Sequence, residues 1–169
     1  MSEELKLNKN LSDEEVYIQL LASSHHLFVE GDKILSGLSN FTAMLKQAFD
    51  KISWVGFYFL DGEKLFLGPF QGNTACTEIK MNHGVCGTSA IKREPLIVDD
   101  VDKFPGHIVC DSGSKSEIVV PILIENELIG VLDLDSYEYS SFNETDKKYL
   151  EELLVVFTKK IDLRKFKII

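Results

Sequence analysis

Cys110 is the strongest candidate for a nucleophile in this sequence. It lies in residues 106–111, a polar, turn-rich run that shortly precedes the apolar run 116–121. A thiol in a loop just before an apolar strand is well placed to meet a substrate. The neighbouring carboxylate of Asp111 disfavours a thiolate, so we expect loop amides or a helix terminus to supply the activation.

Two further cysteines extend this thiol chemistry. Cys86 lies between Gly84 and Gly87 at an expected helix start, where backbone N–H groups favour a thiolate, although a small residue in a tight turn explains it equally well. Cys76 is uninformative by itself. Three cysteines are an odd number, which favours redox or catalytic use over a structural disulfide framework. The alternative is that all three are small buried hydrophobic residues. Together, three thiols could support attack, resolution by disulfide and reduction.

An acidic face is predicted for the strand at 129–136. A strand has a period of two, so Asp133 and Asp135 share one face while Leu132 and Leu134 share the other. Two like charges on one face cost free energy unless they are solvated or bind something, and such a pair raises at least one pKa. One carboxyl then suits a general acid and the other an ammonium group. The alternative is a strand end emerging into water.

Glu117 and two aromatic residues complete the candidate pocket. Glu117 opens its strand on the same face as Val119, and the alternative for it is a solvated edge charge. Trp54 and Tyr58 share one face of the expected strand 54–60. They could form a box for a polarised sulfur or a cation, although aromatic residues more commonly serve in a core. We interpret the set as one pocket with an aromatic wall, an acidic wall and a thiol.

The elements that must position these residues form an α+β pattern. A capping box of Ser12 and Glu15 opens a helix that runs to about Phe28, a second helix covers about 32–49, and Asn143 caps a closing helix. Between them lie expected strands at 54–60, 64–68, 77–81, 96–98, 117–123 and 127–135, a short helix at 88–92, and a long loop at 99–115 that carries Cys110. Helices from both chain ends therefore pack on one face of a mainly antiparallel central sheet.

Composition limits the classes of function. A chain of 169 residues with 44% hydrophobic residues predicts one packed domain over 1–169, with residues 1–10 flexible or loosely packed. A net charge of -9 argues against a nucleic-acid partner. The acidic amino terminus lacks the pattern of a signal peptide, and no apolar run reaches the roughly 18 residues of a membrane span. We therefore expect a cytoplasmic protein without a membrane association.

Between about Ser53 and Ser141 the sequence closely resembles the free methionine-(R)-sulfoxide reductases, a single-domain family with the GAF fold. The motifs that carry the resemblance are Trp54-Val-Gly-Phe-Tyr58, Leu67-Gly-Pro-Phe-Gln-Gly72, Ala75-Cys76, Gly84-Val-Cys86-Gly-Thr88, Gly106-His-Ile-Val-Cys110-Asp111, Ser116-Glu117-Ile118-Val119 and Gly130-Val-Leu-Asp133-Leu-Asp135-Ser136. No departure from the family pattern occurs at these positions. The segments before Asn40 and after Phe157 carry no specific motif, which leaves the oligomeric state open, a homodimer included.

The resemblance implies roles for the candidate residues. Cys110 would be the nucleophile, Cys86 the main resolving thiol and Cys76 an auxiliary one, with the dominant resolving thiol left open. Trp54 and Tyr58 would cage the methyl region of the sulfoxide. The carboxylates of Glu117, Asp133 and Asp135 would bind the amino group or assist proton transfer, and the resemblance does not say which is the acid.

The activity implied is reduction of free methionine (R)-sulfoxide through a cysteine sulfenic acid and an intramolecular disulfide, as in defence against oxidative stress. It requires no metal and no bound cofactor, and thioredoxin or another dithiol would be the external reductant. The alternative is a GAF module that binds a small molecule or senses redox state without turnover. A purely structural interaction protein would leave the pattern of thiols and carboxylates unexplained.

Overall fold

The computed structural model describes residue 8 and residues 10–166, so most of the expected flexible segment 1–10 lies outside the described residues. One six-stranded antiparallel sheet has the order β3-β2-β1-β6-β5-β4. The strands are β1 (Trp54–Asp61), β2 (Lys64–Gln71), β3 (Glu78–Lys80), β4 (Leu96–Val98), β5 (Ser116–Ile124) and β6 (Glu127–Ser136). The predicted α+β architecture is confirmed.

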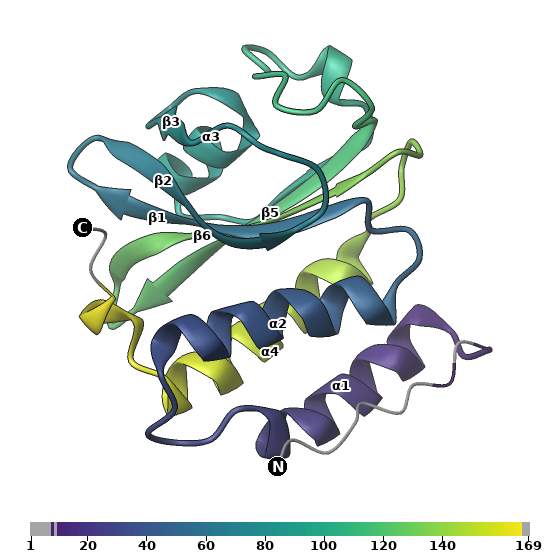
Figure 1. The fold of residues 1–169 in the computed structure, drawn as a ribbon. Helices are drawn as coiled ribbons and strands as arrows, with labels where there is room; N and C mark the ends of the chain where they lie inside the picture. Colours follow the sequence, from purple (N-terminus) through teal and green to yellow (C-terminus); the bar gives the residue numbers. More distant parts are fainter. Residues whose placement is uncertain (1–7, 9, 167–169) are drawn as a thin grey trace.

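The helices divide between the two faces of the sheet. Helices α1 (Asp13–Leu27), α2 (Ile34–Ala48) and α4 (Glu144–Lys160) lie together on one face, with α2 and α4 against the strands and α1 packed on α4 (Figure 1). Helix α3 (Gly84–Lys92) lies on the opposite face, against β5 and β6. Short 3-10 helices occur at η1 (Val101–Lys103) and η2 (Leu163–Lys165). The expected packing of both chain ends on one face is therefore present.

Local sequence signals explain where the long helices begin. The Ser12 side chain caps α1 and Glu15 reaches back to the backbone N–H of Ser12, which makes the predicted capping box. Asn143 and Asp146 form the same arrangement at the start of α4. Both boxes provide partners for N–H groups that the first turn of a helix leaves without intrahelical acceptors.

One ion pair joins the outer helix to the rest of the fold. Asp146 is fully buried, and one of its carboxylate oxygens accepts hydrogen bonds from the Tyr17 hydroxyl at 2.9 Å and from the Lys51 ammonium at 2.7 Å. Lys51 also reaches Asp13, whose side chain is half exposed, at 2.6 Å. The buried carboxylate therefore has a compensating charge, as a buried ion requires.

The period of two in the strands separates two apolar clusters. Val55, Phe57 and Phe59 of β1 face the helices together with Leu132 and Leu134 of β6. The alternate residues of these strands face α3, where a second apolar cluster includes Trp54, Tyr58, Val119, Val131 and Val85. The sheet therefore has an apolar core on its helical face and a different environment on its other face.

Two elements differ from the predicted boundaries. Helix α3 begins at Gly84, four residues earlier than expected, because Gly84 adopts a positive φ of 60° at the helix start and the Thr88 hydroxyl donates to its carbonyl. Strand β2 continues to Gln71 through Pro69, because a bulge between the Gly56 and Tyr58 pairings accommodates the proline.

No described helix is both long and apolar enough to cross a lipid bilayer.

Candidate active site

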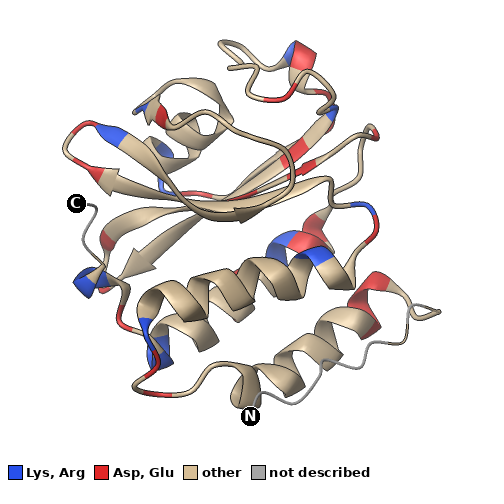
Figure 2. Ribbon diagram, in the orientation of Figure 1, with Lys and Arg blue, Asp and Glu red and all other residues tan. Residues whose placement is uncertain are grey.

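Three carboxyl groups meet on the face of the sheet opposite the long helices. The antiparallel register places Glu117 of β5 directly across from Asp135 of β6, and Val119 across from Asp133. Glu117 is therefore a direct neighbour of one aspartate and a diagonal neighbour of the other. Figure 2 shows these acidic parts of β5 and β6 next to each other near the loop at 99–115.

Burial decides between the two interpretations of these acids. Glu117 is 7% exposed and Asp133 is 6% exposed, while Asp135 is partly buried. The alternatives of a solvated edge charge for Glu117 and a strand end in water for Asp133 are therefore wrong. Among the described residues, no hydrogen-bond partner is found for Oδ1 of Asp133.

The cluster retains protons to a higher pH than ordinary carboxylic acids do. Burial raises the pKa of Glu117 well above its usual value, and the charges of Asp133 and Asp135 raise it further. Burial raises the pKa of Asp133 to about 6, against the opposing effect of hydrogen bonds from Cys86 and Glu117. Burial and the Asp133 charge likewise raise the pKa of Asp135. At a given pH, protonated carboxyl groups are therefore more abundant in this site than among exposed acids.

Trp54 and Tyr58 form one wall of the site. Their rings stack with centroids 6.0 Å apart, on the face of β1 that the sequence predicts. The Trp54 indole donates to the carbonyl of Asn73 at 3.0 Å, and the Tyr58 hydroxyl donates to the carbonyl of Cys76 at 2.9 Å. Gly56 lies between them because a side chain there would overlap the Trp54 ring. The aromatic residues therefore line the site and also hold the loop that carries Cys76.

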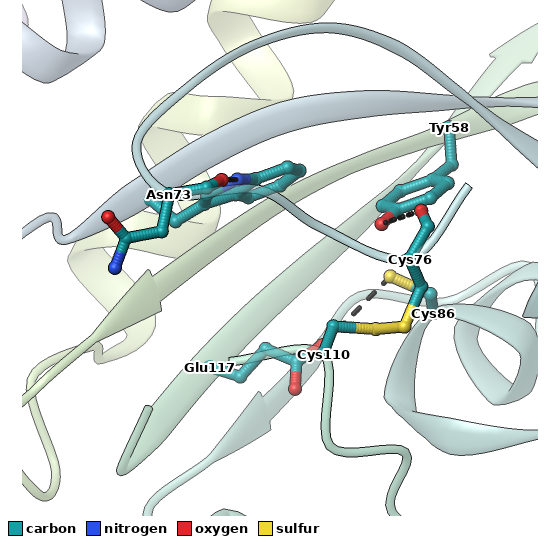
Figure 3. Close-up of a disulfide and its surroundings, with 7 residues drawn as sticks. Tyr58, Asn73, Cys76, Cys86, Cys110 and Glu117 are labelled. Atoms are coloured by element: carbon teal, nitrogen blue, oxygen red, sulfur yellow. Dashed lines mark hydrogen bonds between the residues drawn. A yellow bond between two sulfur atoms is a disulfide. The ribbon is translucent and has the colours of Figure 1, made fainter. Parts of the chain in front are cut away.

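Cys110 is joined by a disulfide to Cys76, across 34 residues of sequence (Figure 3). Cys86, which the resemblance implies as the main resolving thiol, is a free, buried thiol in this structure. The physical reason is that Cys86 lies within α3, packed among apolar residues, whereas Cys76 and Cys110 lie on two loops that meet over the sheet.

Cys86 contacts the acidic cluster. Its sulfur lies 3.9 Å from Oε1 of Glu117, as the dashed line in Figure 3 marks. Burial raises the pKa of the Cys86 thiol well above its usual value, and the charges of Asp133 and Glu117 raise it further. The expected stabilisation of a thiolate by the start of the helix is therefore wrong, because burial and neighbouring carboxylates outweigh it.

These groups surround a single pocket of about 530 Å³, a volume that includes its opening to solvent. Every candidate residue from the sequence lines it except Cys76, whose carbonyl and sulfur hold its rim. The full lining is Trp54, Tyr58, Thr74, Ala75, Ile79, Gly84, Val85, Cys86, His107, Ile108, Cys110, Asp111, Ser114, Glu117, Asp133 and Asp135. No lysine or arginine is among these described lining residues, so neither residue type offers a counter-charge to the acids when they are ionised.

Sequence reasoning missed the contacts that join the two cysteine loops. The Asn73 amide donates to Oδ2 of Asp111 at 3.2 Å and to the Tyr137 hydroxyl at 2.8 Å, and the Tyr137 hydroxyl donates to Oδ2 of Asp111 at 2.9 Å. We call these three residues the loop clasp. Its members lie 38 and 64 residues from Asn73, so no periodic signal in the sequence could have grouped them.

Two other lining residues were also missed. The Ser114 hydroxyl hydrogen-bonds to Asp135 and lowers the pKa of that carboxyl against the larger effect of burial. His107 lies at the pocket, and partial burial lowers the pKa of its ring. Both belong to the loop at 99–115, whose length alone marked it as a functional segment.

Comparison with known proteins identifies the family to which the chain is related. A family model described as "GAF domain" matches residues 38–156. GAF domain-containing protein A of Dictyostelium discoideum is 48% identical over 155 residues, which cover 91% of this chain and 97% of that protein. The free methionine-R-sulfoxide reductase of Escherichia coli is 39% identical over 155 residues, which cover 90% of this chain and 94% of that protein.

A solved structure agrees with these relatives. The free methionine-R-sulfoxide reductase of Neisseria meningitidis, determined in complex with its substrate, is 40% identical and superposes with a TM-score of 0.88, covering 95% of this chain and 97% of that one. By sequence and by structure, the chain belongs to the GAF-domain family of free methionine-R-sulfoxide reductases.

Proposed function

We propose that this protein reduces free methionine (R)-sulfoxide to methionine with its own thiols. The observation that carries the proposal is the arrangement of Cys110 over a pocket that combines an aromatic wall with three carboxyl groups. A sulfoxide offers a polarised S=O group to the thiol and the acids, and the α-ammonium of a free amino acid offers the positive charge that the lining lacks.

The first chemical step transfers the sulfoxide oxygen to Cys110. The Cys110 thiolate attacks the sulfoxide sulfur, and a carboxylic acid of the cluster protonates the oxygen as the S–O bond of the substrate breaks. Methionine leaves, and Cys110 becomes a sulfenic acid, which is two electrons more oxidised than the thiol. Glu117 and Asp133 are the proposed proton source, since burial raises the pKa of both carboxyls.

The second step forms a disulfide. The Cys76 thiol attacks the Cys110 sulfenic acid, an S–S bond forms, and the oxygen leaves as water. The disulfide between Cys76 and Cys110 supports this assignment over resolution by Cys86. An external dithiol, for which we propose thioredoxin, then returns both cysteines to thiols and is itself oxidised to a disulfide.

Asp135 is the proposed partner of the substrate ammonium. It is less buried than Glu117 and Asp133, and its carboxyl lines the pocket beside Trp54 on the neighbouring strand. An ammonium there would contact both a carboxylate and an aromatic face, two arrangements that bind cations. The proton donors and the acid that binds the amine are thereby different members of one cluster, in which Asp135 lies directly across from Glu117.

The alternative is a GAF module that binds a small molecule without turnover. A module that only binds a small molecule needs no pair of cysteines able to close a disulfide at the mouth of its pocket, whereas a redox-sensing module would use the pair without consuming sulfoxide. The direct test measures loss of free methionine sulfoxide, resolved by diastereomer, with dithiothreitol or thioredoxin as reductant. We expect consumption of the R form alone and no turnover by Cys110→Ser. Binding of the sulfoxide without loss of either diastereomer would favour the alternative.

A further inference from the structure

Beside the disulfide, three side chains of types that can ligate a metal lie close together. The Cys86 sulfur, a Glu117 oxygen and an Asp133 oxygen all lie within 4.8 Å of one another. The three residues come from α3, β5 and β6, so regular secondary structure holds each of them. All three side chains are buried.

An independent observation indicates that this cluster can accept a cation. Oδ1 of Asp133 is buried without a hydrogen-bond partner among the described residues, although Asp133 is only 6% exposed and lines the pocket. A buried carboxylate oxygen without a partner costs free energy, and a cation in the pocket would remove that cost.

We propose that Cys86, Glu117 and Asp133 bind one zinc ion, with the fourth coordination position open to the pocket. Zinc is chosen because a thiolate together with carboxylates suits a borderline-soft cation and disfavours magnesium or calcium. One sulfur and two carboxylate oxygens, with a water in the fourth position, would give the tetrahedral site that this metal prefers.

The distances require only a small adjustment. Bond lengths of about 2.3 Å to sulfur and about 2.0–2.2 Å to oxygen place tetrahedral ligand atoms roughly 3.3–3.6 Å apart. The Cys86 sulfur is already 3.9 Å from Oε1 of Glu117, and side-chain rotation can bring the Asp133 oxygen inward from within 4.8 Å. On binding, the metal displaces into the buffer the thiol proton of Cys86 and any proton that Glu117 or Asp133 retains.

In the disulfide form, Cys76 and Cys110 cannot act as metal ligands in place of Cys86. Cys76 and Cys110 are bonded to each other, so Cys86 is the one free cysteine of the chain in this state. Zinc would occupy Glu117 and Asp133, the two carboxyl groups proposed as the proton source, and would therefore inhibit turnover, a consequence that rests on the proposed function. Binding of the metal itself does not depend on that function, so it can be tested without any turnover.

The experiment titrates the full-length disulfide form with Zn²⁺ against a chromophoric chelator, and separately with Co²⁺ while its absorption spectrum is recorded. We expect one metal per chain and a thiolate-to-cobalt charge-transfer band. Cys86→Ser should lose that band, and both Cys86→Ser and Asp133→Asn should weaken zinc binding at least tenfold. Asp111→Asn, which alters a carboxylate at the pocket rim outside the cluster, is the matched control and should bind as the wild type does.

Several results would overturn the proposal. Failure of the wild-type disulfide form to take up one zinc ion per chain would be decisive without any variant. Uptake that Cys86→Ser leaves unchanged, or cobalt binding without the charge-transfer band, would place the metal elsewhere. Far-UV circular dichroism and a thiol count establish that each variant retains its fold and its disulfide.

Discussion

Replacing Asp133 by asparagine should make the ligand-free protein more stable while abolishing its activity. Asp133 is buried, and burial raises the pKa of its carboxyl from 3.8 to about 6. The folded state therefore binds a proton more tightly than the unfolded chain does. The stability that this carboxyl contributes is present in full below about pH 4 and is lost as the pH rises through about 6.

The size of the effect follows from the displacement of the pKa. At 1.36 kcal/mol per pH unit, the rise from 3.8 to about 6 corresponds to about 3 kcal/mol of stability lost at neutral pH. Asparagine has nearly the same shape and no charge, so Asp133→Asn should recover most of that energy. For a chain of this size, the gain corresponds to a rise in Tm of roughly 6–12 °C.

The assay is urea denaturation of wild type and Asp133→Asn, both in the disulfide form, at about pH 4 and about pH 8. The two proteins should be nearly equal in stability at the lower pH and should differ by about 3 kcal/mol at the higher one. Asp111→Asn is a control for which we expect the opposite change in stability, because a backbone hydrogen bond from Gly113 and the loop clasp lower the pKa of Asp111. That variant should be less stable than the wild type at about pH 8.

The reasoning would be refuted if Asp133→Asn were less stable than wild type at both pH values. The hydrogen bonds that Asp133 makes with Cys86 and Glu117 would then outweigh the cost of its burial. A gain in stability of equal size at both pH values would show that the effect does not come from the titration of the Asp133 carboxyl. Loss of turnover in the more stable variant would show that the Asp133 carboxylate serves the activity and lowers the stability of the fold.

Three further predictions concern the resolving thiol, the substrate amine and the buried ion pair. Cys76→Ser should release about one methionine per chain in a single turnover but should not be recycled by thioredoxin. Cys86→Ser should still be recycled. The reverse pattern would identify Cys86 as the resolving thiol. N-acetylmethionine sulfoxide should show a kcat/KM at least about a hundredfold below that of the free amino acid, because acetylation removes the ammonium, and equal values would leave the acids with proton transfer alone. Lys51→Met should lower the free energy of unfolding, measured by urea denaturation, by about 3–5 kcal/mol, because it leaves Asp146 without its counter-charge. Asp13→Asn, at the exposed partner of Lys51, should lower it by less than about 1 kcal/mol. Similar losses in the two variants would contradict the conclusion that the buried pair is the stronger one.

The parts of the site that depend on strand alternation could be predicted from the sequence. A period of two places Asp133 and Asp135 on one face of β6 and Trp54 and Tyr58 on one face of β1, and the register of the sheet then brings these faces together. The same rule placed Glu117 on the face of Val119. These residues share the pocket because the pattern leaves few other ways to bury the apolar face of each strand.

The partner of Cys110 could not be predicted in this way. It depends on the paths of two irregular loops, which are fixed by hydrogen bonds from Tyr58 to the carbonyl of Cys76 and by the loop clasp. Such contacts join residues far apart in sequence and leave no periodic trace. The sequence left the environment of Cys86 open for a related reason, since its burial depends on how α3 lies over β5 and β6.

The alternation of β6 also limits how this protein can diverge in evolution. Leu132 and Leu134 pack against the helices while Asp133 faces the pocket, so substitutions on one face can alter ligand preference without disturbing the other. A single-residue insertion or deletion within the strand would exchange the two faces and place carboxylates among the apolar helices. We therefore expect related chains to vary in length at the turn of Glu125 and Asn126 and to keep the spacing along β6 fixed.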